Sequence, residues 1–297
     1  MPVIPWNRRL FLGANCRLCP QHISNFDTGA SLKIGIVGFG AMARSLTKLL
    51  AQYAPDIAVL AVMVRDIPEV RSAALPPGAR FVRSVQDLLA QPLDLVVECA
   101  GHAALRSTGV AILESGVDLL VASVGALADV SVEATLVQAA KAGHAKLRIP
   151  SGALGGLDVL GAARMGGLQT VIYRSRKAPQ AWFGTPAEQM IDLAHLAEEA
   201  TFFMGNARSA ALAFPQNANV AAAVALAGMG FEKTQVHLTA DPSAIGNTHL
   251  IEAAGEFGSI HIVINGRTLL DNPKTSMLAP LSLVRCLLNL SQSIVIA

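Results

Sequence analysis

Short runs of apolar residues recur through the first half of the chain, and within them apolar and polar positions do not alternate. These runs cover residues 33–37, 58–64, 93–100 and 118–123. Helical patterns separate them, beginning with the apolar positions Leu46, Leu49 and Leu50. A strand without alternation is buried on both faces, and helical connections make neighbouring strands parallel. The pattern therefore predicts an α/β fold in which residues 32–150 form a doubly wound parallel sheet.

The pattern changes at residues 149–158, a glycine-rich segment that we take as a domain boundary. Short β-like runs follow at residues 170–174, 234–239 and 259–264. Helical patterns lie near residues 186–200 and 218–227. This mixture predicts a second, smaller α/β (α+β) domain over residues 151–274, with roles in substrate binding, catalysis and dimerisation. A last helix, at about 276–290 within residues 275–297, is expected to pack back on the first domain.

The composition excludes several classes of protein. Hydrophobic residues make up 52% of the 297 residues and charged residues 15%, whereas a disordered chain has low hydrophobicity and high charge. The net charge of +2 gives no electrostatic footprint for nucleic acid. Residues 209–231 form a charge-free stretch long enough to span a bilayer, but amides cluster near Asn217. We expect this stretch in the interior of a cytoplasmic protein without membrane segments.

Residues 1–31 differ in character from the rest. Arg8 and Arg9 are similar to a twin-arginine export signal, but residues 13–17 interrupt the apolar region that such a signal needs. Cys16 and Cys19 form a CxxC pair without a second pair of ligands at zinc-knuckle spacing. We expect a disordered extension here, and no metal site in the protein.

The first predicted strand leads directly into Gly38-Phe39-Gly40-Ala41-Met42-Ala43, which opens the first helix. This GxGxxA turn is the dinucleotide-binding fingerprint of Rossmann-type domains. Gly38 permits the tight turn, and Gly40 lets the backbone approach a pyrophosphate at the helix N-terminus. The motif predicts an NAD or NADP site that includes Gly38, Gly40, Ala41 and Met42.

The end of the second strand bears on the choice of cofactor. An acidic residue there would hold the ribose hydroxyls of NAD, whereas an arginine can accept the 2′-phosphate of NADP. The strand ends at Arg65, followed by Asp66, so both cofactors stay open.

Ligands of parallel sheets bind at the carboxyl ends of the strands. This rule brings the GxGxxA turn, the pair Gly101-His102 and residues 123–126 to one crevice. We expect Ala100 and Gly101 to contact the cofactor. Cys99, inside the strand, is expected to be a core residue.

Two segments offer side chains for chemistry. His249 stands between small and polar residues that indicate a loop, and a loop histidine suits acid–base work because its ordinary pKa lies near neutrality. A structural role is the alternative. Lys274 and Thr275 lie at an expected helix start, which suits a carboxylate. The alternative there is a helix cap with a solvated lysine.

These motifs recur in one order along the chain from Lys33 to the C-terminus. They comprise residues 38–43, 98–102, 123–127, 150–155, 214–222, 247–249 and 272–276. In that order and spacing the chain resembles the L-aspartate dehydrogenase family. The residues before Ser31 lie outside the resemblance.

The resemblance implies NAD(P)-dependent oxidative deamination of L-aspartate to iminosuccinate, which hydrolyses to oxaloacetate and ammonia, in a reversible reaction linked to NAD biosynthesis. It places the catalytic histidine at His249 and nucleotide contacts at Ala153 and Asn219. It also implies a homodimer. His102, Asn217, Lys274 and Thr275 are further candidates for contact with the substrate. Gln216 departs from the family, whose members often carry lysine there; if that lysine binds a carboxylate, the substrate affinity of this chain is altered, and the sequence leaves this open.

Two other functions stay open from the sequence. One is a related NAD(P)-dependent dehydrogenase of another small amino or keto acid. The other is a dinucleotide-binding sensor without turnover, against which His249 and Lys274 argue.

Overall fold

The computed structural model describes residues 31–66, 75–215, 219–269 and 272–295. Six strands among them form a sheet in the order β3-β2-β1-β4-β5-β6, and every neighbouring pair is parallel. They are β1 Lys33–Val37, β2 Ala58–Met63, β3 Arg80–Val82, β4 Leu95–Glu98, β5 Asp118–Val121 and β6 Leu147–Arg148. This is the doubly wound order of dinucleotide-binding folds, and it confirms the predicted fold class.

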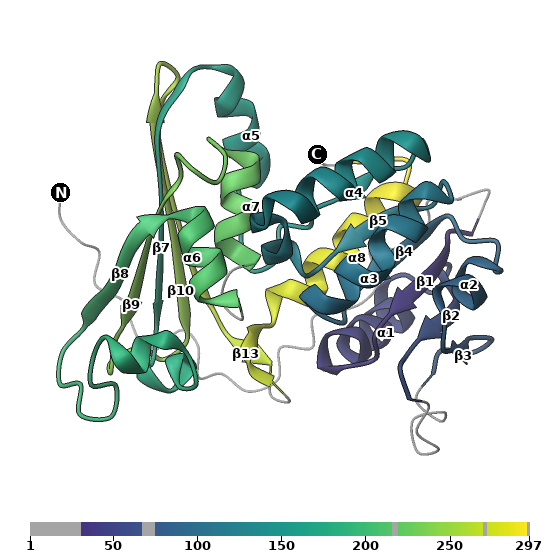
Figure 1. The fold of residues 1–297 in the computed structure, drawn as a ribbon, viewed down its shortest axis with the longest axis horizontal. Helices are drawn as coiled ribbons and strands as arrows, with labels where there is room; N and C mark the ends of the chain where they lie inside the picture. The colour runs from purple at the N-terminus through teal and green to yellow at the C-terminus, as the bar shows by residue number, and fades with distance from the viewer. Residues whose placement is uncertain (1–30, 67–74, 216–218, 270–271, 296–297) are drawn as a thin grey trace.

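Helices cover both faces of this sheet (Figure 1). They are α1 Ala41–Tyr53, α2 Val85–Leu89, α3 His102–Glu114, α4 Val130–Ala142 and α8 Leu278–Ser291. Helix α1 buries Ala43, Leu46, Thr47 and Leu50, the spacing of one helix face. Burial on both faces explains why the strands are apolar at every position.

The C-terminal helix packs back on the first sheet, as predicted. Leu283, Val284 and Leu287 of α8 share a core cluster with Ile34 and Leu46. The helix thus closes the face that α1 covers, although it is the last element of the chain (Figure 1).

Five strands form a second, mixed sheet in the order β11-β10-β7-β9-β8 within the described residues. They are β7 Leu168–Lys177, β8 Ala200–Asn206, β9 Gln235–Ala240, β10 Asn247–Gly255 and β11 Gly258–Gly266. Strands β7 and β9 are parallel and the other pairs antiparallel. The short strands β12 Thr268–Leu269 and β13 Asn272–Ser276 connect this sheet to α8.

One face of the second sheet is covered by α5 Leu157–Met165, α6 Ala207–Ala213 and α7 Asn219–Ala227 (Figure 1). The prediction that residues 209–231 belong to the interior is confirmed for the described part, because α6 and α7 bury small residues such as Ala210, Ala222 and Ala225. These alanines share one core cluster with both sheets. No helix among the described residues is long and apolar enough to cross a bilayer.

Three expectations about local structure were wrong. Lys274 and Thr275 do not start a helix but belong to strand β13, and α8 begins only at Leu278. Residues 186–200 do not form a helix but a single 3-10 turn, Pro186–Gln189, followed by bends. Asp192 stabilises one bend, because its Oδ1 accepts hydrogen bonds from the backbone N–H groups of Ala194 and His195. The segment around His249 is not a loop but strand β10. Polar residues misled the prediction there, because they point to a cleft instead of an apolar core.

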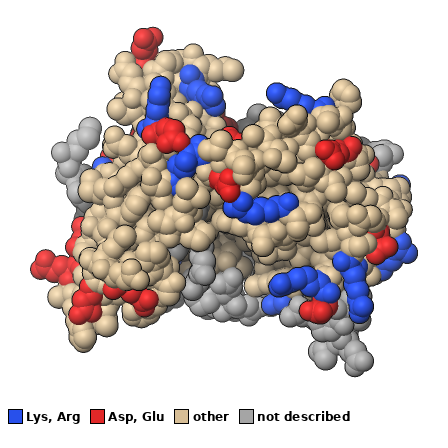
Figure 2. Space-filling model, in the orientation of Figure 1, with Lys and Arg blue, Asp and Glu red and all other residues tan. Residues whose placement is uncertain are grey.

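Basic and acidic side chains lie scattered over the face of the molecule that Figure 2 shows, and most of that face is neither. On this face, basic and acidic side chains are therefore interspersed and do not gather into patches of one sign.

Candidate active site

The turn after β1 requires glycine at its first position. Gly38 has φ of +89°, and a Cβ there would lie 2.6 Å from Cβ of Ala100. Gly40 differs, because a Cβ added there would meet nothing within 4 Å. The turn therefore leaves open space in front of the N-terminus of α1, where a pyrophosphate has room and free N–H groups to bind.

A buried carboxylate ties the ends of two neighbouring strands together. Oε1 of Glu98 accepts hydrogen bonds from the backbone N–H groups of Ala100 at 2.7 Å and Gly101 at 2.8 Å. Both oxygens also bind Ser123, through its N–H and its hydroxyl at 3.0 Å. This confirms that the ends of β4 and β5 meet at one crevice. Because Glu98 already takes the N–H groups of Ala100 and Gly101, these amides are not available to a phosphate.

Asn219 connects the second sheet's helices to this crevice. It begins α7, and its Oδ1 accepts a hydrogen bond from the Gly125 N–H at 2.9 Å. Nε2 of His102 lies 3.4 Å from the same oxygen. His102 is the first residue of α3, and its side chain is directed to Asn219.

A cleft of about 760 Å³, including the open solvent at its mouth, lies where elements of the two sheets meet. Met42 of α1 and Val124, after β5, line it from the first sheet's side, and Lys177, Asn247 and His249 line it from the second sheet. Ala153 lines it from the segment between β6 and α5, Asn219 from the start of α7, and Thr275 from β13. Residues far apart in the sequence thus face one cavity, which is the usual form of a small-molecule site.

His249 lies on the covered face of β10, and its side chain is 2% exposed. Its Nδ1 is 2.7 Å from the hydroxyl oxygen of Tyr173 on β7. Burial, and then the charge of Lys177, lower the pKa of His249 to about 3, so the imidazole is neutral near pH 7. Burial raises the pKa of Tyr173, which keeps the phenol protonated. With Nδ1 engaged by Tyr173, Nε2 is the ring nitrogen left for the cleft.

Lys177 ends β7 on the same face of the sheet as Tyr173. Its side chain is buried, and Nζ lies 5.1 Å from the centroid of the Trp182 ring. Burial lowers the pKa of Lys177 to about 8. The cleft therefore contains a buried ammonium beside a neutral imidazole.

Sequence reasoning missed Tyr173, Lys177 and Glu98. The alternation of buried positions Val171, Tyr173, Ser175 and Lys177 is the signal for the first two. We ended the predicted strand at Arg174, three residues before its observed end.

The remaining sequence candidates fall into four groups. Met42, Ala153, Asn219, His249 and Thr275 line the cleft together. Gly38, Gly40 and Ala41 form the turn from β1 into α1, and Ala100 and Gly101 follow the end of β4. Arg65 is exposed just after β2, and His102 is not among the residues that line the cleft. Asn217, Gln216, Cys16, Cys19 and the side chain of Lys274 lie outside the described residues.

The two cysteines in the described part of the chain, Cys99 and Cys286, are both free thiols. Burial raises the pKa of Cys99 well above its ordinary value, which disfavours the reactive thiolate. Within residues 31–66, 75–215, 219–269 and 272–295, no group of three or more His, Cys, Asp or Glu side chains could hold a metal ion.

Comparison with known proteins identifies the family. Residues 158–290 match the family described as aspartate dehydrogenase, C-terminal, and residues 38–150 match the NAD-binding domain of homoserine dehydrogenase. The chain is 46% identical to an L-aspartate dehydrogenase from Ralstonia nicotianae over 89% of this chain and 99% of the relative. It is 45% identical to another from Cupriavidus necator, with the same coverage.

The comparison with solved structures agrees. The fold is similar to that of the aspartate dehydrogenase from Thermotoga maritima, with a TM-score of 0.72, 26% identity and coverage of 90% of this chain and 99% of that one. A homoserine dehydrogenase from Thiobacillus denitrificans shares the fold at 13% identity, with a TM-score of 0.58 and coverage of 88% of this chain and 73% of that one. The chain therefore belongs to the aspartate dehydrogenase family, whose relatives it matches over nearly their whole length.

Proposed function

We propose that this protein is an NAD(P)-dependent L-aspartate dehydrogenase. It oxidises L-aspartate to iminosuccinate, which water converts to oxaloacetate and ammonia, and it also catalyses the reverse reaction. The observation that carries the proposal is the position of His249. A buried, neutral imidazole from the second sheet faces a cleft whose other wall belongs to the nucleotide fold.

The residues present fit the cofactor. The open space at Gly40 and the free N–H groups at the start of α1 suit a pyrophosphate. NAD(P), when bound, supplies the hydride acceptor at C4 of its nicotinamide ring. Met42, Ala153 and Asn219 would hold the nicotinamide half, since they line the cleft. The exposed Arg65 would tolerate a 2′-phosphate.

His249 would manage a proton of the substrate. Hydride can leave the Cα of aspartate only when the nitrogen has a lone pair, so the ammonium group must first lose a proton. When the Tyr173 hydroxyl accepts a hydrogen bond from Nδ1–H of His249, Nε2 carries the lone pair that takes this proton. The substrate's carboxylates raise the pKa of His249, because a negative charge favours the imidazolium.

The proposed role of His249 in proton transfer is the one expected from the sequence, but its physical basis is different. A loop histidine would have a pKa near neutrality, but burial makes the imidazole of His249 a weak base. Without substrate His249 is a weak base, and it becomes a stronger base when the anionic substrate binds. Proton transfer is thereby coupled to substrate binding.

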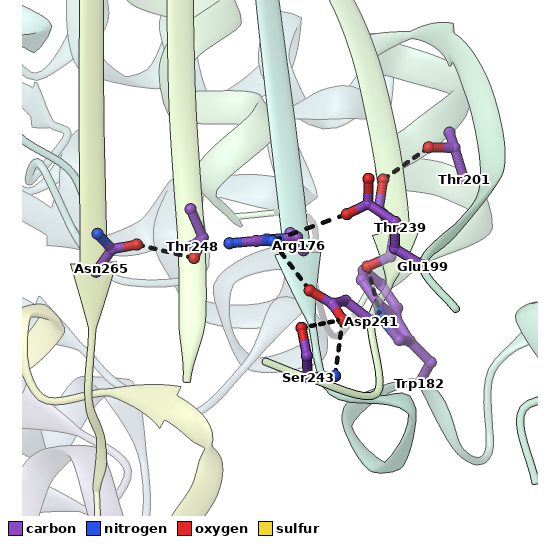
Figure 3. A network of polar contacts seen from close by, with 9 residues as sticks. All are labelled: Arg176, Trp182, Glu199, Thr201, Thr239, Asp241, Ser243, Thr248 and Asn265. Atoms are coloured by element: carbon purple, nitrogen blue, oxygen red, sulfur yellow. Dashed lines mark hydrogen bonds and ion pairs between the residues drawn. The ribbon is translucent and has the colours of Figure 1, made fainter. Parts of the chain in front are cut away.

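The proposal also covers the domains of the protein, its location in the cell and its oligomeric state. Residues 32–150 and 275–297 serve as the nucleotide domain, and residues 151–274 serve as the substrate domain. The protein acts in the cytoplasm as a homodimer. What supports the dimer is the face of the second sheet opposite α5, α6 and α7, where Met204 and Val263 are exposed. Polar side chains including Arg176, Asp241 and Thr239 form a network on this face (Figure 3).

The test is the formation of NADH or NADPH from L-aspartate by the purified protein. A panel of L-alanine, L-asparagine and L-homoserine serves as the comparison. We expect L-aspartate to have the highest kcat/KM. Preference for another amino acid would support a related dehydrogenase, and cofactor binding without turnover of any substrate would support a sensor.

A further inference from the structure

Resting on the proposed function, we infer that Asn247 and Ser276 together bind one carboxylate of the substrate. Both residues line the cleft that His249 faces. His249 manages a proton at the substrate nitrogen, so other side chains must hold the far end of the molecule. The inference starts from hydrogen-bond donors of Asn247 and Ser276 that have no acceptor within the described residues.

Asn247 places an amide on the covered face of β10. It lies two residues before His249 and so shares that face, and its side chain is only 6% exposed. Most buried amides in proteins have a hydrogen-bond partner, because burial without one is unfavourable. The Asn247 side chain has none among the residues that the structure describes. Its amide N–H groups are therefore available to an acceptor that enters the cleft.

Ser276 supplies a second donor. It is the last residue of β13, and it is 5% exposed. Its Oγ accepts a hydrogen bond from the backbone N–H of Leu278 at 3.2 Å. A hydroxyl can donate as well as accept, and within the described part of the chain the Ser276 hydroxyl donates to no acceptor. Its hydrogen is thus available to a ligand.

Gly266 brings these two residues together. It is the strand partner of Asn247 in β11. A Cβ at residue 266 would lie 3.2 Å from Oγ of Ser276 and 3.6 Å from the backbone oxygen of Asn247. A larger residue would therefore crowd the Ser276 hydroxyl, whereas glycine allows β13 to lie close to the start of β10. Asn247 and Ser276 are consequently neighbours in the wall of the cleft.

This pair of donors suits a carboxylate. An ionised carboxylate has two oxygens that only accept hydrogen bonds, and the amide and the hydroxyl can each donate to one of them. Hydrogen bonds to a charged acceptor are stronger than those between neutral groups. Among the described residues that line the cleft there is no aspartate or glutamate, so no acidic side chain of that lining repels an anion.

The spacing to His249 fits a short substrate. Two residues along a strand correspond to roughly 7 Å, which separates Asn247 from His249. A hydrogen bond of about 3 Å at each end leaves room for the few atoms between the nitrogen and a carboxylate of aspartate. The substrate nitrogen can therefore reach Nε2 of His249 while a carboxylate binds Asn247 and Ser276.

Two substitutions with matched controls test the inference. Asn247→Asp keeps the size of the side chain but replaces its N–H donors by a negative charge, and Ser276→Ala removes the hydroxyl. Gln138→Glu on α4 and Ser107→Ala on α3 make similar changes at exposed positions outside the cleft. The measurements are kcat and KM for L-aspartate, and the dissociation constants of NADH and, with NAD present, of succinate by calorimetry. Thermal unfolding of each variant checks that it is folded.

We expect Asn247→Asp to raise KM and the succinate constant about 100-fold or more, because it replaces a hydrogen bond by repulsion. Ser276→Ala should raise both about 10-fold, which is the effect of one hydrogen bond to a charged group. The kcat should fall much less, the NADH constant should stay unchanged, and both controls should behave as wild type. The ratio of kcat/KM for L-aspartate to that for L-asparagine identifies the carboxylate: it falls in Asn247→Asp if the side-chain carboxylate is bound and stays constant if the α-carboxylate is bound.

Three results would overturn the inference. One is a wild-type protein that does not bind succinate. Another is a succinate constant in Asn247→Asp that equals that of Gln138→Glu. The third is a weaker affinity for NADH with unchanged affinity for succinate, which would assign the donors to the cofactor. Should Asn247→Asp fail to fold, Asn247→Ala decides by the same constants, with an expected rise of about 10-fold. Failure of the proposed function would look different, since the wild-type protein would then not oxidise L-aspartate while succinate binding could still be measured.

Discussion

The hydroxyl oxygen of Tyr173 lies 2.7 Å from Nδ1 of His249, and both side chains are buried between the second sheet and its helices. The rings are also nearly parallel, at 18°, with centroids 6.0 Å apart. The pair fixes which imidazole nitrogen faces the cleft, and it allows either tautomer because a hydroxyl can donate or accept.

Removal of the hydroxyl in Tyr173→Phe should therefore impair both catalysis and stability. Nδ1 of His249 would be buried without its partner, which costs about 1–3 kcal/mol of the free energy of unfolding. We also expect a lower kcat, because the orientation of the imidazole ring is no longer fixed. The measurements are urea unfolding and steady-state kinetics. The chain has one other tyrosine, the exposed Tyr53, so Tyr53→Phe is a matched control. Equal kcat in the two variants would show that the Tyr173 hydroxyl does not position His249.

The two glycines of the GxGxxA turn should respond differently to alanine. Gly38→Ala combines a positive φ with a contact of 2.6 Å to Ala100, so we expect a loss of about 1–3 kcal/mol of stability. Gly40→Ala meets no protein atom within 4 Å, so the protein should fold normally and bind NADH and NADPH more weakly. Thermal unfolding and fluorescence titration of the cofactors separate the two effects. Normal cofactor affinity in Gly40→Ala would contradict the placement of the pyrophosphate.

Glu98→Gln tests the connection between the strand ends. A glutamine has one acceptor oxygen where the carboxylate has two, and it cannot satisfy all four donors from Ala100, Gly101 and Ser123. We expect the free energy of unfolding to fall by about 1–3 kcal/mol and the KM for the cofactor to rise, because the hydrogen bonds that connect the ends of β4 and β5 are incomplete. Glu114→Gln, at the exposed end of α3, is the control. A Glu98→Gln protein with unchanged stability and cofactor KM would show that the tie is dispensable.

The buried lysine should make stability depend on pH. Burial lowers the pKa of Lys177 from 10.5 to about 8, so the unfolded chain binds more protons between these values and stability rises with pH across that window. Below pH 8 the folded protein bears the full cost of the buried ammonium. The lowering of the Lys177 pKa corresponds to about 3 kcal/mol of the free energy of unfolding. Lys177→Met should thus be more stable than wild type at pH 7, by up to that amount, and the difference should shrink toward pH 10. Denaturant unfolding of both proteins at pH 7 and pH 10 measures this, and a difference independent of pH would rule out the titration of Lys177 as its cause.

The nucleotide half could be predicted from the sequence because its signals are local. Residues 33–37 and the glycines after them form a strand, a turn and a helix through contacts close in sequence, and the same holds for β4 and β5. The site on the second sheet depends on contacts between distant residues. Tyr173 and His249 are 76 positions apart, and only strand pairing brings them together.

The polar residues of β10 show the same limit. Asn247 and His249 occupy the buried face of a strand, where the alternation of apolar residues would ordinarily indicate the core. Their polarity suits the cleft, but in the sequence it is typical of a loop. The polar residues that the site requires are therefore the reason why this strand could not be predicted from the sequence.

The most direct test of the central claim is the loss of NADH or NADPH absorbance with oxaloacetate and ammonium, with an ammonium-free control. Wild type, His249→Ala and His195→Ala should be compared, since His195 is exposed and lies outside the cleft. We predict ammonium-dependent loss of absorbance in wild type and His195→Ala, and a kcat lower by about 100-fold or more in His249→Ala. Loss that does not require ammonium, or near-normal turnover by His249→Ala, would contradict the account.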